Sequence, residues 1–242
     1  MKIALIGYGK MGKAIEEIAI ERGHSIVAKI NQSTPIESLK SLEADVAIEF
    51  TRPDAAVANI QFCLNHSLPV VVGTTAWYDA FEHVKNEVAQ HNGALLHASN
   101  FSVGVNIFFE INRMLAQLMQ PYAEYTASVE EIHHLQKLDA PSGTAVTIAN
   151  AILENNPALN TWKLGEENHP TTQKNELAIT SYRKPDVPGT HIVKYQSSID
   201  TIEIMHEAHN RKGFALGAVL AAEFLKDKKG IFTMSDVLNI GK

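Results

Sequence analysis

The sequence contains a single cysteine, Cys63, which excludes an internal disulfide and is typical of proteins from a reducing compartment. It has no apolar run of membrane-spanning length and no basic-apolar leader pattern at its start. It has no run of like charges, and a net charge of −6 gives no general affinity for nucleic acid or anionic membranes. We therefore expect a cytoplasmic globular protein with no nucleic-acid or membrane partner.

The first hundred residues alternate short apolar runs with helical patterns. Five apolar runs predict strands buried on both faces, at residues 2–6, 25–30, 45–50, 69–75 and 93–99. Helices are predicted between them, after the sequence "GYGKMG", from Pro53 and from Trp77. This alternation predicts an α/β fold with a doubly wound parallel sheet.

The pattern changes after residue 103. A long helical segment at 104–122 precedes strand-like runs at 125–134, 176–183, 191–198 and 201–209, with a polar excursion at 155–175. These runs predict a second α+β domain on a mixed or antiparallel sheet. The helical run from Gly213 should return to the first domain, since another covering helix suits an open parallel sheet. The predicted domains are 1–103 plus 213–242, which binds a dinucleotide, and 104–212, which binds substrate and forms oligomers.

A glycine-rich turn follows the first strand. Gly7, Gly9 and Gly12 form G-x-G-x-x-G at the opening of a helix, with Tyr8, Lys10 and Met11 between them. The first glycine permits the tight turn, the second lets a diphosphate approach the backbone, and the third allows close helix–strand contact. A purely structural turn is the alternative, but the strand–turn–helix context favours a dinucleotide site.

An acidic residue that would hold the ribose is absent after the second predicted strand. Residues 29–36 contain Lys29, Asn31 and hydroxyl side chains but no carboxylate before Glu37. Such a site should tolerate the extra phosphate of NADPH, which Lys29 or the nearby hydroxyl groups would receive, so NADPH is slightly favoured over NADH. The alternative is that Asn31 holds the ribose of either cofactor.

Three further loops follow predicted strands and should lie at the same edge of the sheet, where open sheets bind ligands. Helix capping accounts for each loop taken alone, whereas together they can line a nicotinamide site. The candidate residues are Phe50 and Thr51; Gly73, Thr74 and Thr75; and Ala98, Ser99, Asn100 and Phe101.

The stretch "EIHHLQKLDAPSGTA", residues 131–145, gathers titratable groups before a helical run. Adjacent His133 and His134 near a strand end point to opposite faces, which makes a shared zinc site poor, and we predict no metal. Ordinary, partly exposed histidines are the alternative reading. The turn at Ser142, Gly143 and Thr144 opens a helix, whose first amides can hold a carboxylate.

These groups suit one chemistry. Lys137 can pair with a carboxylate, and a histidine can deliver a proton near neutral pH. Proton donor, cation and anion cradle are the parts needed to reduce a conjugated imine that bears carboxylates. The expected ligand is thus a small dicarboxylate.

Several motifs together resemble the dihydrodipicolinate reductase (4-hydroxy-tetrahydrodipicolinate reductase) family of the diaminopimelate–lysine pathway. Residues 131–145 fit its signature E-x-H-H-x-x-K-x-D-A-P-S-G-T-A, and its F-T-R-P, G-T-T and N-F-S-V-G-V-N segments occur at 50–53, 73–75 and 100–106. The resemblance extends to "R-x-x-F-A-x-G-A" at 211–218.

The resemblance implies a Rossmann-like domain, a sheet-forming domain that builds a homotetramer, and NAD(P)H as hydride donor. It makes His133 the proton donor and Lys137 the residue that orients the substrate. It also assigns the substrate carboxylates to His134, Gly143 and Thr144, and the cofactor to residues 7–12, 73–75 and 98–101.

The sequence departs from the family in two places, both of which concern the cofactor. Its glycine turn is one residue shorter than the usual seven, and Asn31 and Gln32 replace a common acid–arginine pair. Two other functions stay open on the residues alone: an amino-acid dehydrogenase acting on an imine, and a non-enzymatic nucleotide sensor. A sensor would leave the cluster at 131–145 without a role.

Overall fold

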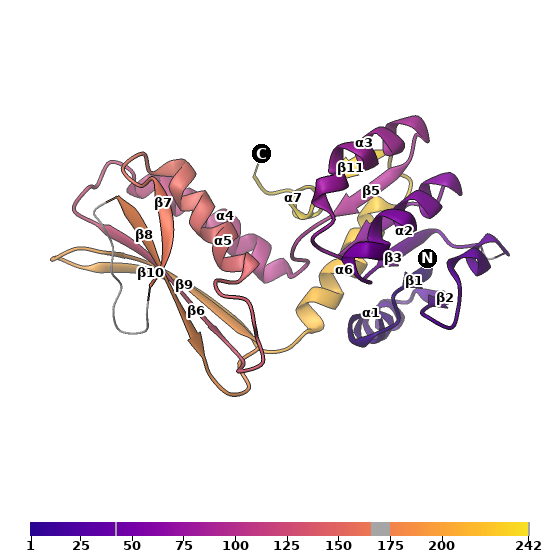
Figure 1. The fold of residues 1–242 in the computed structure, drawn as a ribbon, viewed down its shortest axis with the longest axis horizontal. Coiled ribbons are helices and arrows are strands. Elements are labelled where there is room, and N and C mark those ends of the chain that lie inside the picture. Colours follow the sequence, from indigo (N-terminus) through magenta and orange to yellow (C-terminus); the bar gives the residue numbers. More distant parts are fainter. Residues whose placement is uncertain (42, 166–174, 242) are drawn as a thin grey trace. The chain divides into compact units, whose positions relative to one another are not determined.

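The computed structural model describes residues 1–41, 43–165 and 175–241. The chain forms two compact units, residues 1–103 with 211–242, and residues 104–210 (Figure 1). None of the helices that it describes combines the length and the apolar character needed to cross a bilayer.

The first unit contains a six-stranded parallel sheet in the order β11-β5-β4-β3-β1-β2. Its elements are β1 (Lys2–Ile6), α1 (Lys10–Glu21), β2 (Ser25–Ile30), the 3-10 helix η1 (Ile36–Ser41), β3 (Val46–Glu49), α2 (Pro53–Asn65), β4 (Val70–Val72), the 3-10 helix η2 (Tyr78–Ala80), α3 (Phe81–Gln90), β5 (Ala94–His97), α6 (Lys212–Leu225), β11 (Gly230–Phe232) and α7 (Met234–Leu238).

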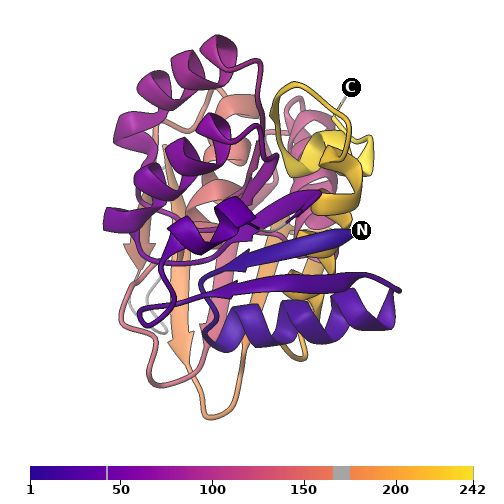
Figure 2. The ribbon, with the colours of Figure 1, turned by 90° about the vertical axis from the view of Figure 1, so that its right-hand side faces the viewer.

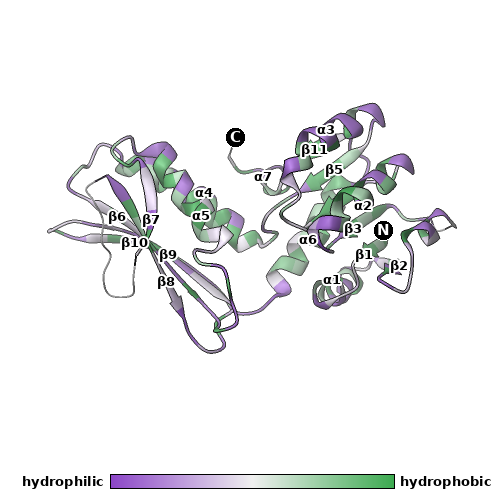
Figure 3. Cartoon of the chain, viewed as in Figure 1, coloured by the Kyte–Doolittle hydropathy of each residue, from purple (hydrophilic) through white to green (hydrophobic). Residues whose placement is uncertain are grey.

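Helices cover both faces of this sheet, as its continuous apolar strands require. In β1, Ile3 and Leu5 pack with α1 and α6, whereas Ala4 and Ile6 pack with α2 and α3. Figure 2 shows α1 on one side of the sheet and α2 with α3 on the other. Helix α6 is mostly hydrophobic along its length (Figure 3), because it lies against the strands β3, β4 and β5.

The second unit is built on a five-stranded mixed sheet in the order β10-β9-β6-β8-β7. Strand β6 pairs parallel with β8 and antiparallel with β9. The elements are α4 (Val103–Met119), β6 (Thr126–His133), α5 (Gly143–Asn155), β7 (Thr161–Gly165), β8 (Glu176–Arg183), β9 (Gly189–Gln196) and β10 (Thr201–Ala208). Helices α4 and α5 pack on one face of this sheet through Phe108, Ile148 and Ile152.

The two sheets confirm the predicted fold class, and two strands were not foreseen. Strand β7 lies inside the stretch 155–175 that was expected to be a polar excursion, and it pairs with β8 at the sheet edge. Residues 166–174 of that stretch lie outside the described residues. Strand β11 follows α6, where the helical pattern was expected to run to residue 230, and it extends the parallel sheet beside β5. Short edge strands leave too little periodicity to be recognised from sequence.

Candidate functional site

The glycine-rich turn of the first unit has the geometry that its spacing predicts. Gly7 has φ +98°, and a Cβ there would lie 2.0 Å from the carbonyl oxygen of Phe50. A Cβ on Gly12 would lie 2.4 Å from the oxygen of Gly7, so α1 packs closely on the turn. Gly9 caps α1 and has no atom within 4 Å of its Cβ position, which leaves its backbone open to a ligand.

Two cavities adjoin this turn, of about 790 and 320 Å³. The larger cavity is lined by the turn, by Asn31 and the residues after β2, and by Arg52. The smaller is lined by Lys10, Met11, Phe50 and residues 73–75. Gly9 and Thr51 belong to both linings, which brings most of the predicted cofactor residues together at the carboxyl ends of β1, β3 and β4.

Two of the loops are tied to one another. The amide of Thr51 donates to Oγ1 of Thr74 at 2.7 Å, and a Cβ on Gly73 would meet the Phe50 ring at 2.2 Å. The third loop, 98–101, does not contribute to these two linings. Its Phe101 is buried, and its ring lies 5.6 Å from that of Phe50, centroid to centroid.

Lys29 on β2 and Asn31 after it both have partners within the protein. Lys29, considered for the extra phosphate of NADPH, donates to Glu16 at 2.6 Å and lies over the Tyr8 ring. Oδ1 of Asn31 accepts from the amides of Ser33 and Thr34, which fixes the turn. The larger cavity has no carboxylate in its described lining, and Arg52 is its cation.

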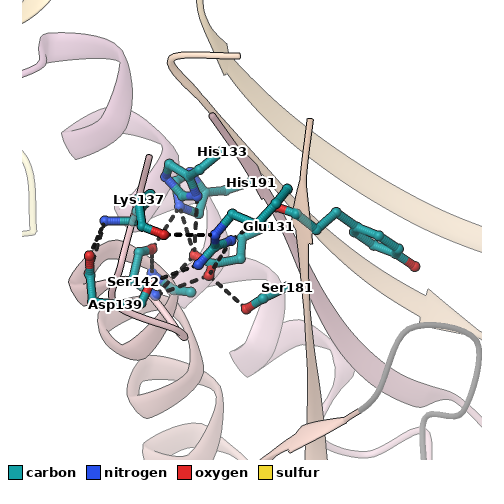
Figure 4. A network of polar contacts seen from close by, with 10 residues as sticks. Glu131, His133, Lys137, Asp139, Ser142, Ser181 and His191 are labelled. Carbon is teal, nitrogen blue, oxygen red and sulfur yellow. Dashed lines mark hydrogen bonds and ion pairs between the residues drawn. The ribbon is translucent and has the colours of Figure 1, made fainter. Parts of the chain in front are cut away.

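A second group of polar residues lies at one end of the sheet in the second unit (Figure 4). Along β6, the residues that face α4 and α5 change from Ala127 and Val129 to Glu131 and His133. The neighbouring strands are polar at the same level, because Glu131 is paired with Ser181 on β8 and with His191 on β9. Three strands therefore become polar at the same end, next to the start of α5.

Glu131 lies at the centre of this group and is fully buried. Its two carboxylate oxygens accept from the amide of Ser142 at 3.1 and 3.0 Å, and Oε1 accepts from the hydroxyl of Ser181 at 2.7 Å. Burial opposes ionisation, but the hydrogen bonds from Ser142 and Ser181 and the neighbouring His133 outweigh it. The pKa of Glu131 is therefore lowered, and its carboxylate is ionised at neutral pH.

Helix α5 begins next to Glu131, which accepts from the amide of its N-cap residue Ser142. Ser142 caps the helix, since its Oγ accepts from the amide of Ala145 at 3.1 Å, and the same Oγ lies 3.2 Å from Nε2 of His191. The polar groups of Ser142 thus have partners within the protein. Gly143 has no atom within 4 Å of its Cβ position, so the first turn of α5 is open to a ligand there.

The loop between β6 and α5 carries Lys137. Its Nζ donates to both carboxylate oxygens of Asp139, at 2.8 and 2.9 Å. Arg183 fixes the loop by donating to the carbonyl oxygens of Lys137 at 3.2 Å and Asp139 at 2.7 Å. The arginine also lies 3.8 Å from Glu131, which links the loop to the buried carboxylate.

The two adjacent histidines have different surroundings. His133 is only 7% exposed, with Nδ1 3.6 Å from Oε2 of Glu131 and Nε2 beside Gly189. Desolvation lowers the pKa of His133; Glu131 and Asp139 counteract this effect, and Lys137 and Arg183 add to it. His134 is half-buried and follows the end of β6; its Nδ1 is buried without a hydrogen-bond partner.

Ligand atoms of Glu131, His133 and His191 lie within 4.8 Å of one another, a spacing that a metal ion could use. The chemistry of the surroundings opposes this use. Both oxygens of Glu131 already accept hydrogen bonds, and the guanidinium of Arg183 lies within 4 Å of one of them. A divalent cation would displace these donors against a neighbouring positive charge, so we treat the cluster as a hydrogen-bonded network.

Sequence reasoning missed four residues of this group: Ser181, Arg183, Gly189 and His191. Glu131 was part of the recognised signature but received no role. Arg183 and His191 lie at ends of strands that the sequence predicted, "ELAITSYR" and "HIVKYQSS". The signal that would have found them is the pairing of those strand ends with β6, which a single sequence does not specify.

Known proteins match this chain along nearly its whole length. The N-terminal model of dihydrodipicolinate reductase matches residues 1–101, and the C-terminal model matches residues 104–238. A 4-hydroxy-tetrahydrodipicolinate reductase from Christiangramia forsetii is 52% identical, with 99% of this chain and 98% of the relative covered. A second, from Alkaliphilus metalliredigens, is 32% identical, with 99% and 100% covered.

The structure resembles a dipicolinate-bound dihydrodipicolinate reductase from Paenisporosarcina sp. TG-14, with a TM-score of 0.79, 21% identity and 99% of both chains covered. At this identity the likeness supports the fold, and the sequence matches carry the relationship. One family accounts for the Rossmann-like first unit, for the mixed sheet of the second, and for the motifs at 50–53, 73–75 and 131–145. On these grounds the chain is an oxidoreductase of the dihydrodipicolinate reductase family.

Proposed function

We propose that this protein reduces the dehydrated ring of 4-hydroxy-tetrahydrodipicolinate to tetrahydrodipicolinate, in the diaminopimelate–lysine pathway, with NAD(P)H as hydride donor. The observation that carries the proposal is the cluster at one end of the second unit's sheet. There His133, the loop of Lys137 and the start of α5 gather around Glu131, in a chain 52% identical along its length to a curated reductase of that name.

The first unit fits a pyridine dinucleotide. The turn at Gly7 to Gly12 has no room for side chains at its first and third glycines and is open at the second, as a diphosphate site requires. We assign the cofactor to the two cavities around this turn and to residues 98–101. The cofactor supplies the hydride, and the protein's residues hold it, bind the substrate and move a proton.

NADPH is slightly favoured in this proposal. The larger cavity has no carboxylate in its described lining to repel a 2′-phosphate, and Arg52 lines it. Lys29 is not assigned to the phosphate, because Glu16 neutralises it. Asn31 would contact the ribose of either cofactor. Comparing kcat/KM for NADPH and NADH tests the preference.

The second unit would bind the dicarboxylate. Gly143 and Thr144, in the first turn of α5, would hold one carboxylate, because helix starts direct amides and partial positive charge at anions. Ser142 would cap the helix that presents them. Lys137 would orient the ring by exchanging part of its contact with Asp139 for a substrate carboxylate, and His134 would add a contact from the strand end. A single fixed orientation of the ring is what a substrate site must supply for hydride transfer.

His133 would protonate the ring carbon next to the one that receives the hydride. Its Nδ1 faces the Glu131 carboxylate, so Nε2, on the far side of the imidazole, would carry the proton. The proposal locates the reaction in the cytoplasm and makes the active form a homotetramer assembled through the second unit. Light scattering at working concentration gives the oligomeric state.

His133→Ala tests the function. We expect kcat to fall by about 10²- to 10⁴-fold, the usual contribution of a general acid, while NADPH binding followed by fluorescence stays unchanged. Pyridine-2,6-dicarboxylate, a planar mimic, should compete with substrate in the wild-type enzyme. Near-normal turnover in His133→Ala, or no competition by the mimic, would contradict the proposal.

A further inference from the structure

Glu131 is a buried charge that the proposed reaction does not itself use. Its carboxylate is fully buried, and a buried ionised carboxylate is costly unless donors compensate for it. Three hydrogen bonds do so, two from the Ser142 amide and one from the Ser181 hydroxyl. A neutral or apolar side chain would avoid the cost of burial, so the charge itself requires an explanation.

The surroundings of this carboxylate give one. Oε2 lies 3.6 Å from Nδ1 of His133, and that nitrogen is sealed from solvent without a hydrogen-bond partner (Figure 4). The separation is longer than a hydrogen bond, but such contacts in catalytic sites are often long before ligands bind. A carboxylate here favours a proton on Nδ1 and directs Nε2 away from Glu131, to the side where Gly189 lies. It also stabilises the charged imidazolium from which a proton is donated.

The same carboxylate holds the start of α5. The Ser142 amide donates to both oxygens of Glu131. The first turn of α5 and the imidazole of His133 are therefore both positioned by the same carboxylate. The geometry points to Glu131 as a positioning residue. It keeps a proton on Nδ1 of His133, so that Nε2 is the nitrogen that donates, and it fixes the orientation of the imidazole relative to the anion-binding turn. This inference rests on the proposed function, in which His133 is the proton donor.

Other charges also face His133, and they decide the direction of the effect. Glu131 comes from β6, Lys137 and Asp139 from the following loop, Arg183 from β8 and His191 from β9. Desolvation dominates and lowers the pKa of His133, while the two cations act in the same direction. Glu131 contributes the largest opposing effect, so removing its charge should lower the pKa of His133 further.

Glu131→Gln is the decisive variant, because it removes the charge and keeps an acceptor for the Ser142 amide. A general acid must be protonated, so kcat/KM declines above its pKa. In Glu131→Gln we expect kcat to fall on the order of 10- to 100-fold, part of what a general acid supplies, and the alkaline limb to move to lower pH. The Kd of pyridine-2,6-dicarboxylate should change far less. In Glu131→Asp, which keeps the charge, the alkaline decline of kcat/KM should lie closer to its wild-type pH than in Glu131→Gln.

Glu130→Gln is the matched control. Glu130 is the neighbouring residue on β6, points to the other sheet face and pairs with Lys194 at 2.8 Å. Its substitution should leave the pH limb in place. If Glu131→Gln only lowers Tm and keeps the wild-type limb, Glu131 is structural and the inference is wrong.

Two further variants separate the possible failures. If Glu131→Gln does not fold, Ser181→Ala is the test, because it removes one donor from the carboxylate and leaves the charge. The alkaline decline of kcat/KM should then move to higher pH. A decline at the wild-type pH would overturn the inference. Near-normal turnover in His133→Ala removes the proposed proton donor itself. A strong loss in His133→Ala beside a wild-type limb in Glu131→Gln removes only the positioning role.

Discussion

The glycine turn of the first unit and the polar end of the second unit's sheet represent two ways of building a site. The first relies on backbone, since Gly7 and Gly12 have no room for side chains and Gly9 exposes its amide region. The second relies on polar and charged side chains from three strands and a loop around Glu131. Substitutions should therefore act sterically in the first region and electrostatically in the second.

The largest stability effect is expected at Gly7. Gly7→Ala places a Cβ 2.0 Å from the Phe50 oxygen at φ +98°. Backbone strain and overpacking together should lower the free energy of unfolding by roughly 2–6 kcal/mol. Urea unfolding measures this. Gly9→Ala is the control, because its Cβ meets nothing within 4 Å: replacing this N-cap glycine should cost no more than about 1 kcal/mol of stability, while NADPH affinity falls. Equal stabilities of the two variants would contradict the steric reading of this turn.

An intermediate effect is expected from acid on the second region. Burial, reinforced by His133, lowers the pKa of His191 from 6.5 to about 4, although Glu131 acts in the opposite direction and His206 and Lys137 in the same one. Between these values the unfolded chain binds a proton that the folded chain does not, so stability falls as pH falls. From pH 7 to 5 this histidine should cost roughly 2 kcal/mol of unfolding free energy.

Urea unfolding of His191→Asn at both pH values checks the sign. The variant should lose less stability than the wild type on acidification, by an amount close to that histidine's share. His83→Asn, at an exposed position on α3, should retain the wild-type pH dependence. If His191→Asn kept it as well, the buried imidazole would not be the source of the acid sensitivity.

The smallest effect is expected from an ion pair outside both regions. Glu223 on α6 accepts two hydrogen bonds from Arg22 at 2.8 Å and one contact from His24 at 2.7 Å. Solvent reaches this pair, so Glu223→Gln should lower the free energy of unfolding by less than about 1 kcal/mol and leave kcat/KM unchanged. A larger loss would contradict the view that this solvent-exposed ion pair is weak.

Local patterns predicted much of both regions. The strand–turn–helix at Gly7 to Gly12 and the helix start at Ser142 have local causes, because glycine conformation and capping are decided within a few residues. Strands β7 and β11 escaped prediction because each is short and lies at or near a sheet edge, where the apolar pattern is weak. The contact of Lys29 with Glu16 was not predicted, because it joins a strand to a helix.

By itself the sequence determined the α/β order of the first unit, the α+β character of the second, the glycine turn and the cluster at 131–145. Only the tertiary structure decided that Ser181 and His191 flank Glu131 and that Arg183 holds the Lys137 loop. The physical reason is that strand register is a long-range property. It is set by packing the whole sheet against α4 and α5, and side chains distant in sequence become neighbours only once that register is fixed.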